Sequence, residues 1–158
     1  MDELLPDVPA PSLVSAMVEV GLAPWERIPL WAAHWLADGH DGDALRTLAG
    51  LSGRDSNEVH DVVAEALAEC GAPLTGDLVA AVGVVFTEMA RRYVLGADRA
   101  VLGVVGRVLY HSGFPAAVWE MPLAGLCTLL DDWDYEWGQP RDEIRVLVRE
   151  ACAAQLTV

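Results

Sequence analysis

The chain has 158 residues, 53% of them hydrophobic, and its 24 acidic and 10 basic residues give a net charge of −14. This length and composition are typical of a folded protein that buries its own core, which excludes disorder for most of the chain. The charge argues against nucleic acid and anionic lipid as partners, because an acidic surface repels phosphates and attracts cations or basic proteins.

The N-terminal part of the chain begins with an arm and continues with helices. The first residues, MDELLPDVPAPS, are acidic and rich in proline, so we expect a flexible arm over residues 1–11. Ser12 is placed to cap a short helix that ends at Gly21, and Pro29 begins a second helix that runs to Gly39.

Two further helices are predicted before Gly71. Asp41 or Asp43 is placed to cap the first of them, and Asp55 or Ser56 the second. Their spacing resembles a helix–turn–helix, but the second helix carries four acids and no base. Such a helix would face DNA phosphates at a high electrostatic cost, so we expect two packed helices that do not bind nucleic acid.

The rest of the chain also follows the helical period. A long helix is predicted over residues 77–95, and in the helix after it Gly103 and Gly106 would let a neighbouring helix approach closely. Prolines begin the next two segments, and a last helix is predicted over about residues 141–155. No strand-like alternation is present. The sequence therefore predicts an all-α fold, a compact single-domain bundle of about seven or eight helices over residues 12–158.

The charge is unevenly distributed along these helices. Residues 1–77 carry 14 acids and 3 arginines, a net charge of −11, and residues 131–158 carry 7 acids and 3 arginines, a net charge of −4. Residues 78–130 carry 3 acids and 4 arginines, a net charge of +1. We therefore expect the middle third to form the core and the two ends to supply the acidic surface.

Neither a membrane span nor a secretory signal is predicted. The longest apolar run, residues 78–86, is far shorter than the roughly 20 residues that a spanning helix needs. No basic N-terminal region precedes an apolar stretch. Cys70, Cys127 and Cys152 are widely spaced and form no CxxC motif, which is typical of buried thiols in a reducing compartment. We expect a cytoplasmic protein that does not bind membranes.

The segment LLDDWDYEWGQP, residues 129–140, combines acids and aromatic residues without a base. If it continues the apolar helix that begins near Leu123, its acids lie in the last two turns, where the helix dipole disfavours each anion by about 0.3–1 kcal/mol.

Three interpretations of these acids remain open. One interpretation is compensation by Arg141, Arg145 and Arg149 of the next helix. A second is a docking surface for a cationic partner, where the aromatic rings supply cation–π contacts. This second interpretation assigns partner binding to Asp131, Asp132, Trp133, Asp134, Tyr135, Glu136 and Trp137. A divalent-cation site on Asp131, Asp132 or Glu136 is the third interpretation.

Two other groups of residues support alternative functions. Trp31 and Trp35 lie one helical turn apart with His34 between them, which favours either a core position or a pocket for a small molecule. Separately, the order of four residues resembles the H…HD…D pattern of HD-domain phosphohydrolases, which are all-α and bind divalent metals through it: His34, His60, Asp61 and Asp131. The chain departs from that pattern, because polar residues precede the His-Asp pair and no lysine follows it.

The run from Ile28 to Gly71 resembles stretches in small uncharacterised acidic helical proteins of GC-rich bacteria, a resemblance that implies no chemistry. In size, charge and helicity the chain is also similar to bacterial immunity proteins that neutralise basic toxins. We therefore predict a non-catalytic acidic binding protein without a cofactor, an immunity- or inhibitor-type partner of a basic protein. A metal-dependent phosphohydrolase and a small-molecule binder remain alternatives, and the oligomeric state stays open.

Overall fold

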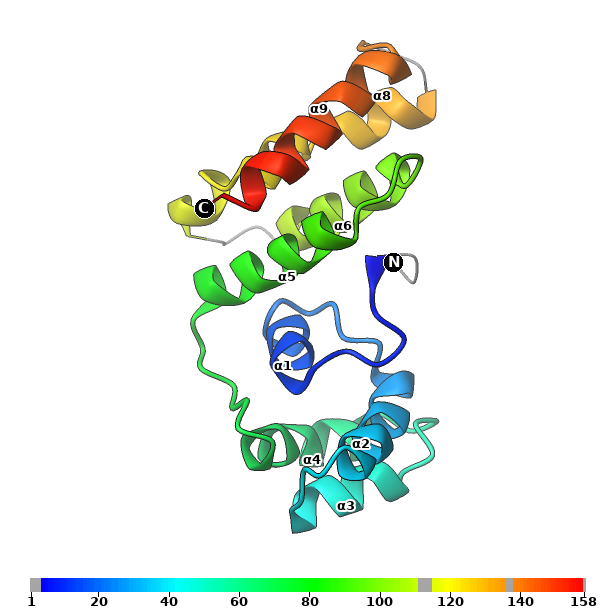
Figure 1. The fold of residues 1–158 in the computed structure, drawn as a ribbon, viewed down its shortest axis with the longest axis vertical. Coiled ribbons are helices and arrows are strands. Elements are labelled where there is room, and N and C mark those ends of the chain that lie inside the picture. Colours follow the sequence, from blue (N-terminus) through cyan, green and yellow to red (C-terminus); the bar gives the residue numbers. More distant parts are fainter. Residues whose placement is uncertain (1–3, 111–114, 136–137, 158) are drawn as a thin grey trace. The chain divides into compact units, whose positions relative to one another are not determined.

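The computed structural model describes residues 4–110, 115–135 and 138–157, and within these ranges it contains nine α-helices and no strand. The all-α fold class predicted from the sequence is confirmed. No helix in the described ranges has the length and apolarity needed to cross a membrane. The elements in chain order are α1 (Pro11–Glu19), the 3-10 helix η2 (Trp25–Arg27), α2 (Ile28–Ala37), α3 (Asp43–Gly50), α4 (Ser56–Glu69), α5 (Leu78–Arg92), α6 (Asp98–Tyr110), α7 (Ala116–Trp119), the 3-10 helix η3 (Pro122–Leu126), α8 (Leu129–Tyr135) and α9 (Arg141–Gln155) (Figure 1).

The chain divides into two compact units, both of which lie largely within the predicted domain over residues 12–158. The N-terminal unit comprises Asp7–Asp77 and contains α1 to α4. The C-terminal unit comprises Leu78–Val158 together with the first six residues, and contains α5 to α9.

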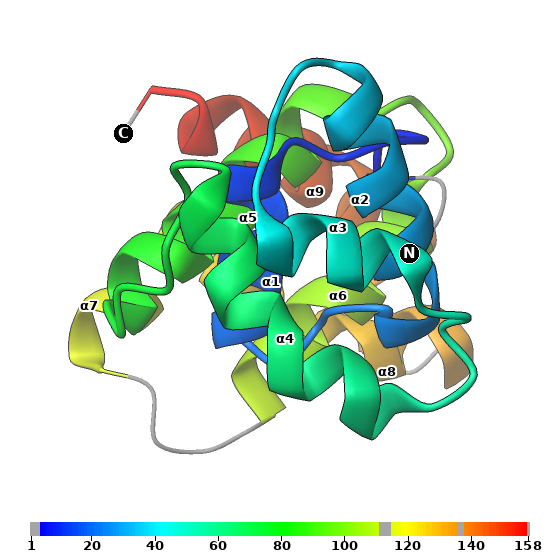
Figure 2. The same cartoon turned by 90° about the horizontal axis from the view of Figure 1, so that it is seen from below.

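In the N-terminal unit, α3 packs between α2 and α4, and α1 packs against α4. Figure 2 shows α3 and α4 side by side. Trp31 and Trp35 of α2 are buried in this unit, with 1% and 2% of their surface exposed. Their indole N–H groups donate hydrogen bonds to the carbonyls of Asp7 (2.9 Å) and Pro9 (2.8 Å). Two residues of the predicted arm are therefore hydrogen-bonded to core side chains, which satisfies polar groups that would otherwise be buried without a partner.

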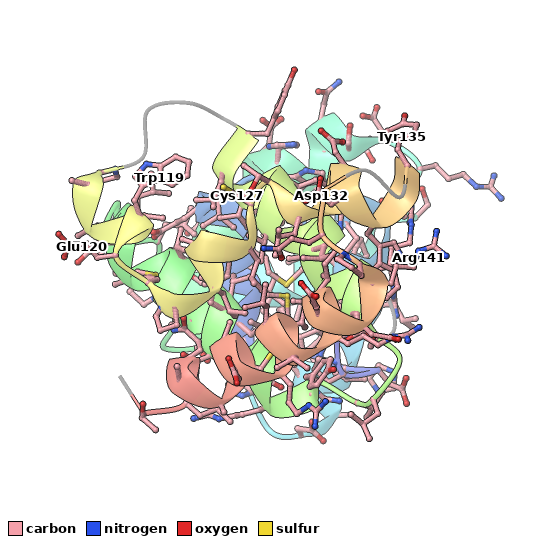
Figure 3. All side chains as sticks on the ribbon, turned by 90° about the horizontal axis from the view of Figure 1, so that it is seen from above. Trp119, Glu120, Cys127, Asp132, Tyr135 and Arg141 are labelled. Atoms are coloured by element: carbon pink, nitrogen blue, oxygen red, sulfur yellow. The ribbon has the colours of Figure 1, made fainter. Side chains whose placement is uncertain are left out.

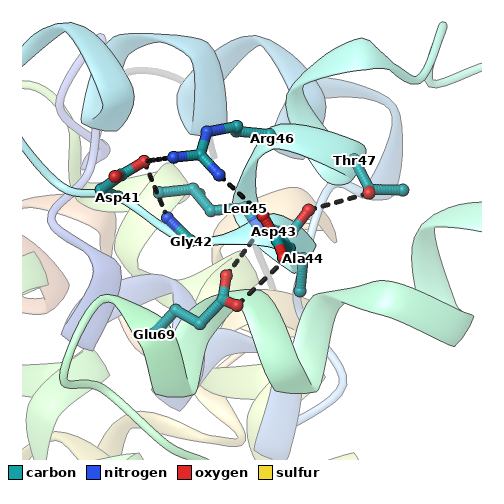
Figure 4. A network of polar contacts seen from close by, with 8 residues as sticks. All are labelled: Asp41, Gly42, Asp43, Ala44, Leu45, Arg46, Thr47 and Glu69. Carbon is teal, nitrogen blue, oxygen red and sulfur yellow. Dashed lines mark hydrogen bonds and ion pairs between the residues drawn. The ribbon is translucent and has the colours of Figure 1, made fainter.

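The N-terminus of α3 is capped by a residue distant in the sequence. The carboxylate of Glu69, the last residue of α4, accepts hydrogen bonds from the backbone N–H groups of Ala44 (3.2 Å) and Leu45 (2.8 Å) (Figure 4). A side chain at Gly42 would overlap this carboxylate. A glycine at this position therefore allows α4 to cap α3, and the bond joins the two helices.

Local caps were correctly predicted for α4 but not for α3. Asp55 accepts a hydrogen bond from the N–H of Asn57 (2.9 Å), as expected of an N-cap. The prediction that Asp41 or Asp43 caps α3 is wrong, because both carboxylates bind the guanidinium of Arg46 instead. The prediction that Ser12 caps α1 is also wrong, since α1 begins at Pro11, a proline in its first turn.

In the C-terminal unit, α9 packs against α5, α6, η3 and α8. Figure 1 shows α8 beside the first half of α9, as these contacts require. One acid lies in the core of this unit: Asp98 at the start of α6 is only 1% exposed. Its carboxylate accepts a hydrogen bond from the Tyr93 hydroxyl (2.7 Å) and lies 3.9 Å from the Arg145 guanidinium. Tyr93 precedes Asp98 in the sequence and Arg145 follows it, and together these two partners offset the cost of burying the Asp98 charge.

Candidate functional site

The acidic aromatic segment begins a helix rather than ending one. Residues 122–126 form η3, the chain turns at residues 127–128, and α8 starts at Leu129. Asp131 and Asp132 therefore lie in the first turn of α8. The prediction of one continuous helix from Leu123 is wrong, and these two acids do not oppose the helix dipole.

Asp134 is neutralised by a cation that the sequence did not single out. Its two carboxylate oxygens accept hydrogen bonds from Nε (2.7 Å) and Nη2 (2.9 Å) of Arg99 on α6. This bidentate pair holds the pKa of Asp134 below its usual range, with a smaller electrostatic contribution from Arg141. The carboxylate of Asp134 is thus already paired within the protein.

The side chain of Asp132 contacts the residues that precede α9. Its carboxylate accepts a hydrogen bond from the N–H of Gln139 (3.4 Å). Gly138 has a positive φ of 75°, and a side chain there would come within 2.8 Å of the same carboxylate. Figure 3 shows Asp132 and Tyr135 on α8 and Arg141 at the start of α9. Asp132 therefore has a structural role in this turn.

The ring of Trp133 is already in contact with arginines of the same chain. The guanidinium carbons of Arg141 and Arg145 lie 5.6 Å and 5.5 Å from the ring centroid, within cation–π range. Arg141 also donates a hydrogen bond to the Trp133 carbonyl (2.9 Å). The predicted return of the α9 arginines toward this segment is therefore present for Arg141 and Arg145, both of which lie over the Trp133 ring, and Arg141 also acts electrostatically on Asp134.

Of the predicted partner-binding residues in the described ranges, Asp131, Asp134 and Tyr135 are exposed, Tyr135 with 68% of its surface accessible, but Asp134 is already paired with Arg99. The side chain of Asp131 makes no hydrogen bond or ion pair with any residue that the structure describes. Glu136 and Trp137 lie outside the described residues. The segment thus presents less free negative charge than its sequence indicates.

Asp131 lies at a groove between α6 and α8 that the sequence did not predict. The groove has a volume of about 390 Å³ and is lined by Gly103, Gly106, Arg107 and Tyr110 of α6 and by Cys127, Leu130 and Asp131. Cys127 is labelled in Figure 3, just before α8. Apart from the backbone of α6 itself, no described residue lies within 4 Å of where a side chain at Gly103 or Gly106 would begin, so no other described helix makes the expected close approach at these glycines.

A second acidic surface lies on α4. Glu58, Asp61 and Glu65 follow one another at spacings of three and four residues and are all exposed. None of their side chains has a hydrogen bond or ion pair within the described residues. Residues at these spacings are neighbours on one face of a helix, so the three carboxylates repel one another, and no basic side chain among the described residues pairs with them.

An aromatic pair joins the same helix to η2. The ring of His60 on α4 stacks on Trp25 of η2, with ring centroids 3.5 Å apart and an interplanar angle of 26°. A side chain at Gly53 would overlap the carbonyl of Glu26, so the turn before α4 passes close to η2. The sequence contains both aromatic residues, but only the packing of η2 against α4 brings Trp25 onto His60 of that helix.

The residues of the two alternative sites are not assembled into sites. Trp31 and Trp35 are core residues with satisfied N–H groups, whereas His34 between them is exposed. Within the ranges that the structure describes, no group of three or more His, Cys, Asp or Glu side chains is arranged to hold a metal ion. The structure therefore does not bring His34, His60, Asp61 and Asp131 together as a metal site.

Comparison with known proteins adds no family to this description. No protein-family model matches the chain, and neither the search of curated proteins nor the search of solved structures finds a match.

Proposed function

We propose that this chain is a non-catalytic acidic binding protein, of the immunity or inhibitor type, that binds a basic protein through the exposed face of α4. The observation that carries the proposal is the row of three unpaired carboxylates of Glu58, Asp61 and Glu65 on that face. We further propose that it acts in the cytoplasm, since its three cysteines are all free.

The charge of the N-terminal unit supports this choice of face. Asp7–Asp77 contains 12 acids and 3 arginines, a net charge of −9, whereas the rest of the chain contains 12 acids and 7 arginines, a net charge of −5. Of the three arginines, Arg46 is paired with Asp41 and Asp43, and Arg27 lies over the ring of Trp31. The α4 face therefore lies in the more negative unit. A field of this sign accelerates encounter with a basic partner and gives specificity through complementary charge.

The aromatic pair beside the acids supports the same face. Trp25 and His60 form a stacked pair on which an arginine or lysine side chain of a partner bound at α4 can lie. A row of acids with an adjacent aromatic surface matches the composition expected of a contact with a basic protein better than α8, where Asp134 and Trp133 already bind arginines of the same chain.

The test compares two triple variants that change the net charge by the same amount. The site variant is Glu58→Gln/Asp61→Asn/Glu65→Gln. The control is Glu120→Gln/Glu143→Gln/Glu150→Gln, which neutralises three exposed acids of the C-terminal unit whose side chains have no hydrogen bond or ion pair with any described residue. The wild-type chain is immobilised, and the proteins that it retains from a cell extract at low salt are purified. The association rate constants of these proteins with the wild type, the site variant and the control are then measured as a function of ionic strength.

We expect the site variant to lower the association rate constant by about tenfold, and the control to lower it by less than about threefold. Equal losses in the two variants would mean that only the net charge matters and that α4 is not the contact. If no basic protein is retained at low salt, or if binding does not weaken as salt is added, the proposed function is wrong.

A further inference from the structure

The groove between α6 and α8 carries one positive and one negative side chain on its two sides. Arg107 belongs to α6 and Asp131 to α8, and both line the groove. Neither side chain has a hydrogen bond or ion pair with a residue that the structure describes, and both are exposed.

The floor of the groove is formed by backbone. Gly103 and Gly106 lie one helical turn apart on α6, and both are only partly exposed. Apart from the adjacent backbone of α6 itself, no atom of the described residues lies within 4 Å of the position of a first side-chain atom at either glycine, so the surface of α6 is open there. Another helix can approach such a surface more closely than it can approach larger side chains.

The arrangement of charge decides which occupant fits. The occupant of the groove must present a negative group to Arg107 and a positive group to Asp131. A strongly basic partner satisfies only the second requirement. A second copy of the chain related by a two-fold axis satisfies both, because each Arg107 then meets Asp131 of the other copy.

We propose that the protein forms a symmetric homodimer in which α6 of each copy crosses α6 of the other at Gly103 and Gly106, with Arg107 of each copy paired to Asp131 of its partner. The exposed ring of Tyr110, which has 85% of its surface accessible, lies at this interface. This dimer uses the C-terminal unit and is independent of the binding function proposed for α4. The net charge of −14 on each copy opposes association, and salt at about 0.15 M reduces this repulsion to a range of about 8 Å.

The test is a charge exchange across the interface, measured by sedimentation equilibrium of the full chain from about 1 μM to 1 mM at that salt concentration. The variants are Arg107→Asp, Asp131→Arg and the double variant with both changes. Gly106→Leu fills the floor of the groove and, because the space there is empty in the single chain, it leaves the fold intact. Arg54→Asp, which changes the charge by the same amount on an exposed residue of the N-terminal unit, is the matched control. Circular dichroism verifies that each variant is folded.

We expect the wild-type chain to reach a mass of twice 17.0 kDa. Each single charge reversal affects two symmetric pairs, so it should weaken the dimer by at least about tenfold, and the double variant should return to within about threefold of wild type. Gly106→Leu should weaken the dimer and Arg54→Asp should not. A wild-type chain that stays monomeric over the whole concentration range overturns the proposal. A monomer is the expected result if Arg107 and Asp131 pair within one chain or bind a small zwitterion. A dimer that survives every variant, or a double variant as weak as the single ones, overturns it as well.

Discussion

Asp132 and Asp134 on α8 each have a partner within the protein, whereas Glu58, Asp61 and Glu65 on α4 have none among the described residues. Both segments are dense in acids in the sequence, and neither contains a base. The difference arises because α6 places Arg99 against α8, whereas none of the three arginines of the N-terminal unit forms an ion pair with Glu58, Asp61 or Glu65 among the described residues. The number of acids in a segment therefore does not predict how much of their charge is available to a partner.

A smaller version of the same contrast exists within α4. Glu69 is exposed like Glu65, but it caps α3 through two hydrogen bonds, while Glu65 has no partner in the described ranges. We therefore expect two acids one turn apart on the same helix to have opposite effects on stability. The following substitutions test whether paired acids stabilise the fold and unpaired ones destabilise it.

We expect the largest change in the free energy of unfolding at Asp98, the buried acid. Tyr93→Phe removes the hydroxyl that donates to Asp98 and leaves a buried carboxylate with only the more distant Arg145 as a partner. We expect a loss of about 1–3 kcal/mol in the free energy of unfolding, measured by urea denaturation. A variant as stable as wild type would show that Asp98 does not depend on this hydrogen bond.

The same pair predicts a change at high pH. Burial, and then the hydrogen bond with Asp98, raises the pKa of Tyr93 from 10.0 to about 12, so the folded state favours the neutral phenol. Its contribution to stability is full below pH 10 and is lost as the pH rises to about 12. We expect wild type to lose stability across this window and Tyr93→Phe to lose less. An equal loss in both proteins would contradict the assignment to Tyr93.

The second largest effect is expected at the cap of α3. Glu69→Ala removes the acceptor for the N–H groups of Ala44 and Leu45, which should cost about 1–2 kcal/mol of the unfolding free energy. Glu65→Ala on the same helix is the control and should cost much less. Gly42→Ala should act like Glu69→Ala, because its methyl group displaces the carboxylate. Equal costs for Glu65→Ala and Glu69→Ala would remove the distinction between paired and unpaired acids on α4.

A gain in stability is expected on the α4 face. The triple variant Glu58→Gln/Asp61→Asn/Glu65→Gln removes two repulsions between neighbouring turns, each of about 0.2–0.5 kcal/mol, so the isolated protein should be stabilised by about 0.4–1 kcal/mol. The gain should shrink as salt is added, because the charges are exposed. Destabilisation by this variant in urea denaturation would mean that these acids support the fold and are not free for a partner.

The smallest effect is expected at the exposed pair on α8. Arg99 lowers the pKa of Asp134 through their hydrogen bonds, so the pair contributes to stability above the usual value of 3.8 and loses that contribution as the pH falls through the lowered value. The stability difference between wild type and Arg99→Gln should therefore be present at neutral pH and disappear in acid. Asp131→Asn is the control, and a similar pH-dependent difference for it would contradict the assignment to the Arg99 pair.

The helices themselves could be predicted from the sequence. The predicted helices over residues 77–95 and 141–155 correspond to α5 and α9. They could be predicted because a helix is indicated by apolar residues at the helical period and by stop signals at its ends, and these signals depend only on residues a few positions apart. The same local reasoning found the Asp55 cap of α4. It failed at Leu123, where the apolar period continues across a 3-10 turn without a break in the pattern.

By itself, the sequence determined the all-α class, the negative charge and the positions of most helices, because these depend on composition and on residues a few positions apart. Only the tertiary structure decided that Glu69 caps α3, that Arg99 neutralises Asp134, and that Trp25 lies beside His60 on α4. These contacts join residues 24 to 35 positions apart, and they form only when helices pack. Whether an acid is paired or free to bind is therefore a property of the packing, and the candidate site moved from α8 to α4 for that reason.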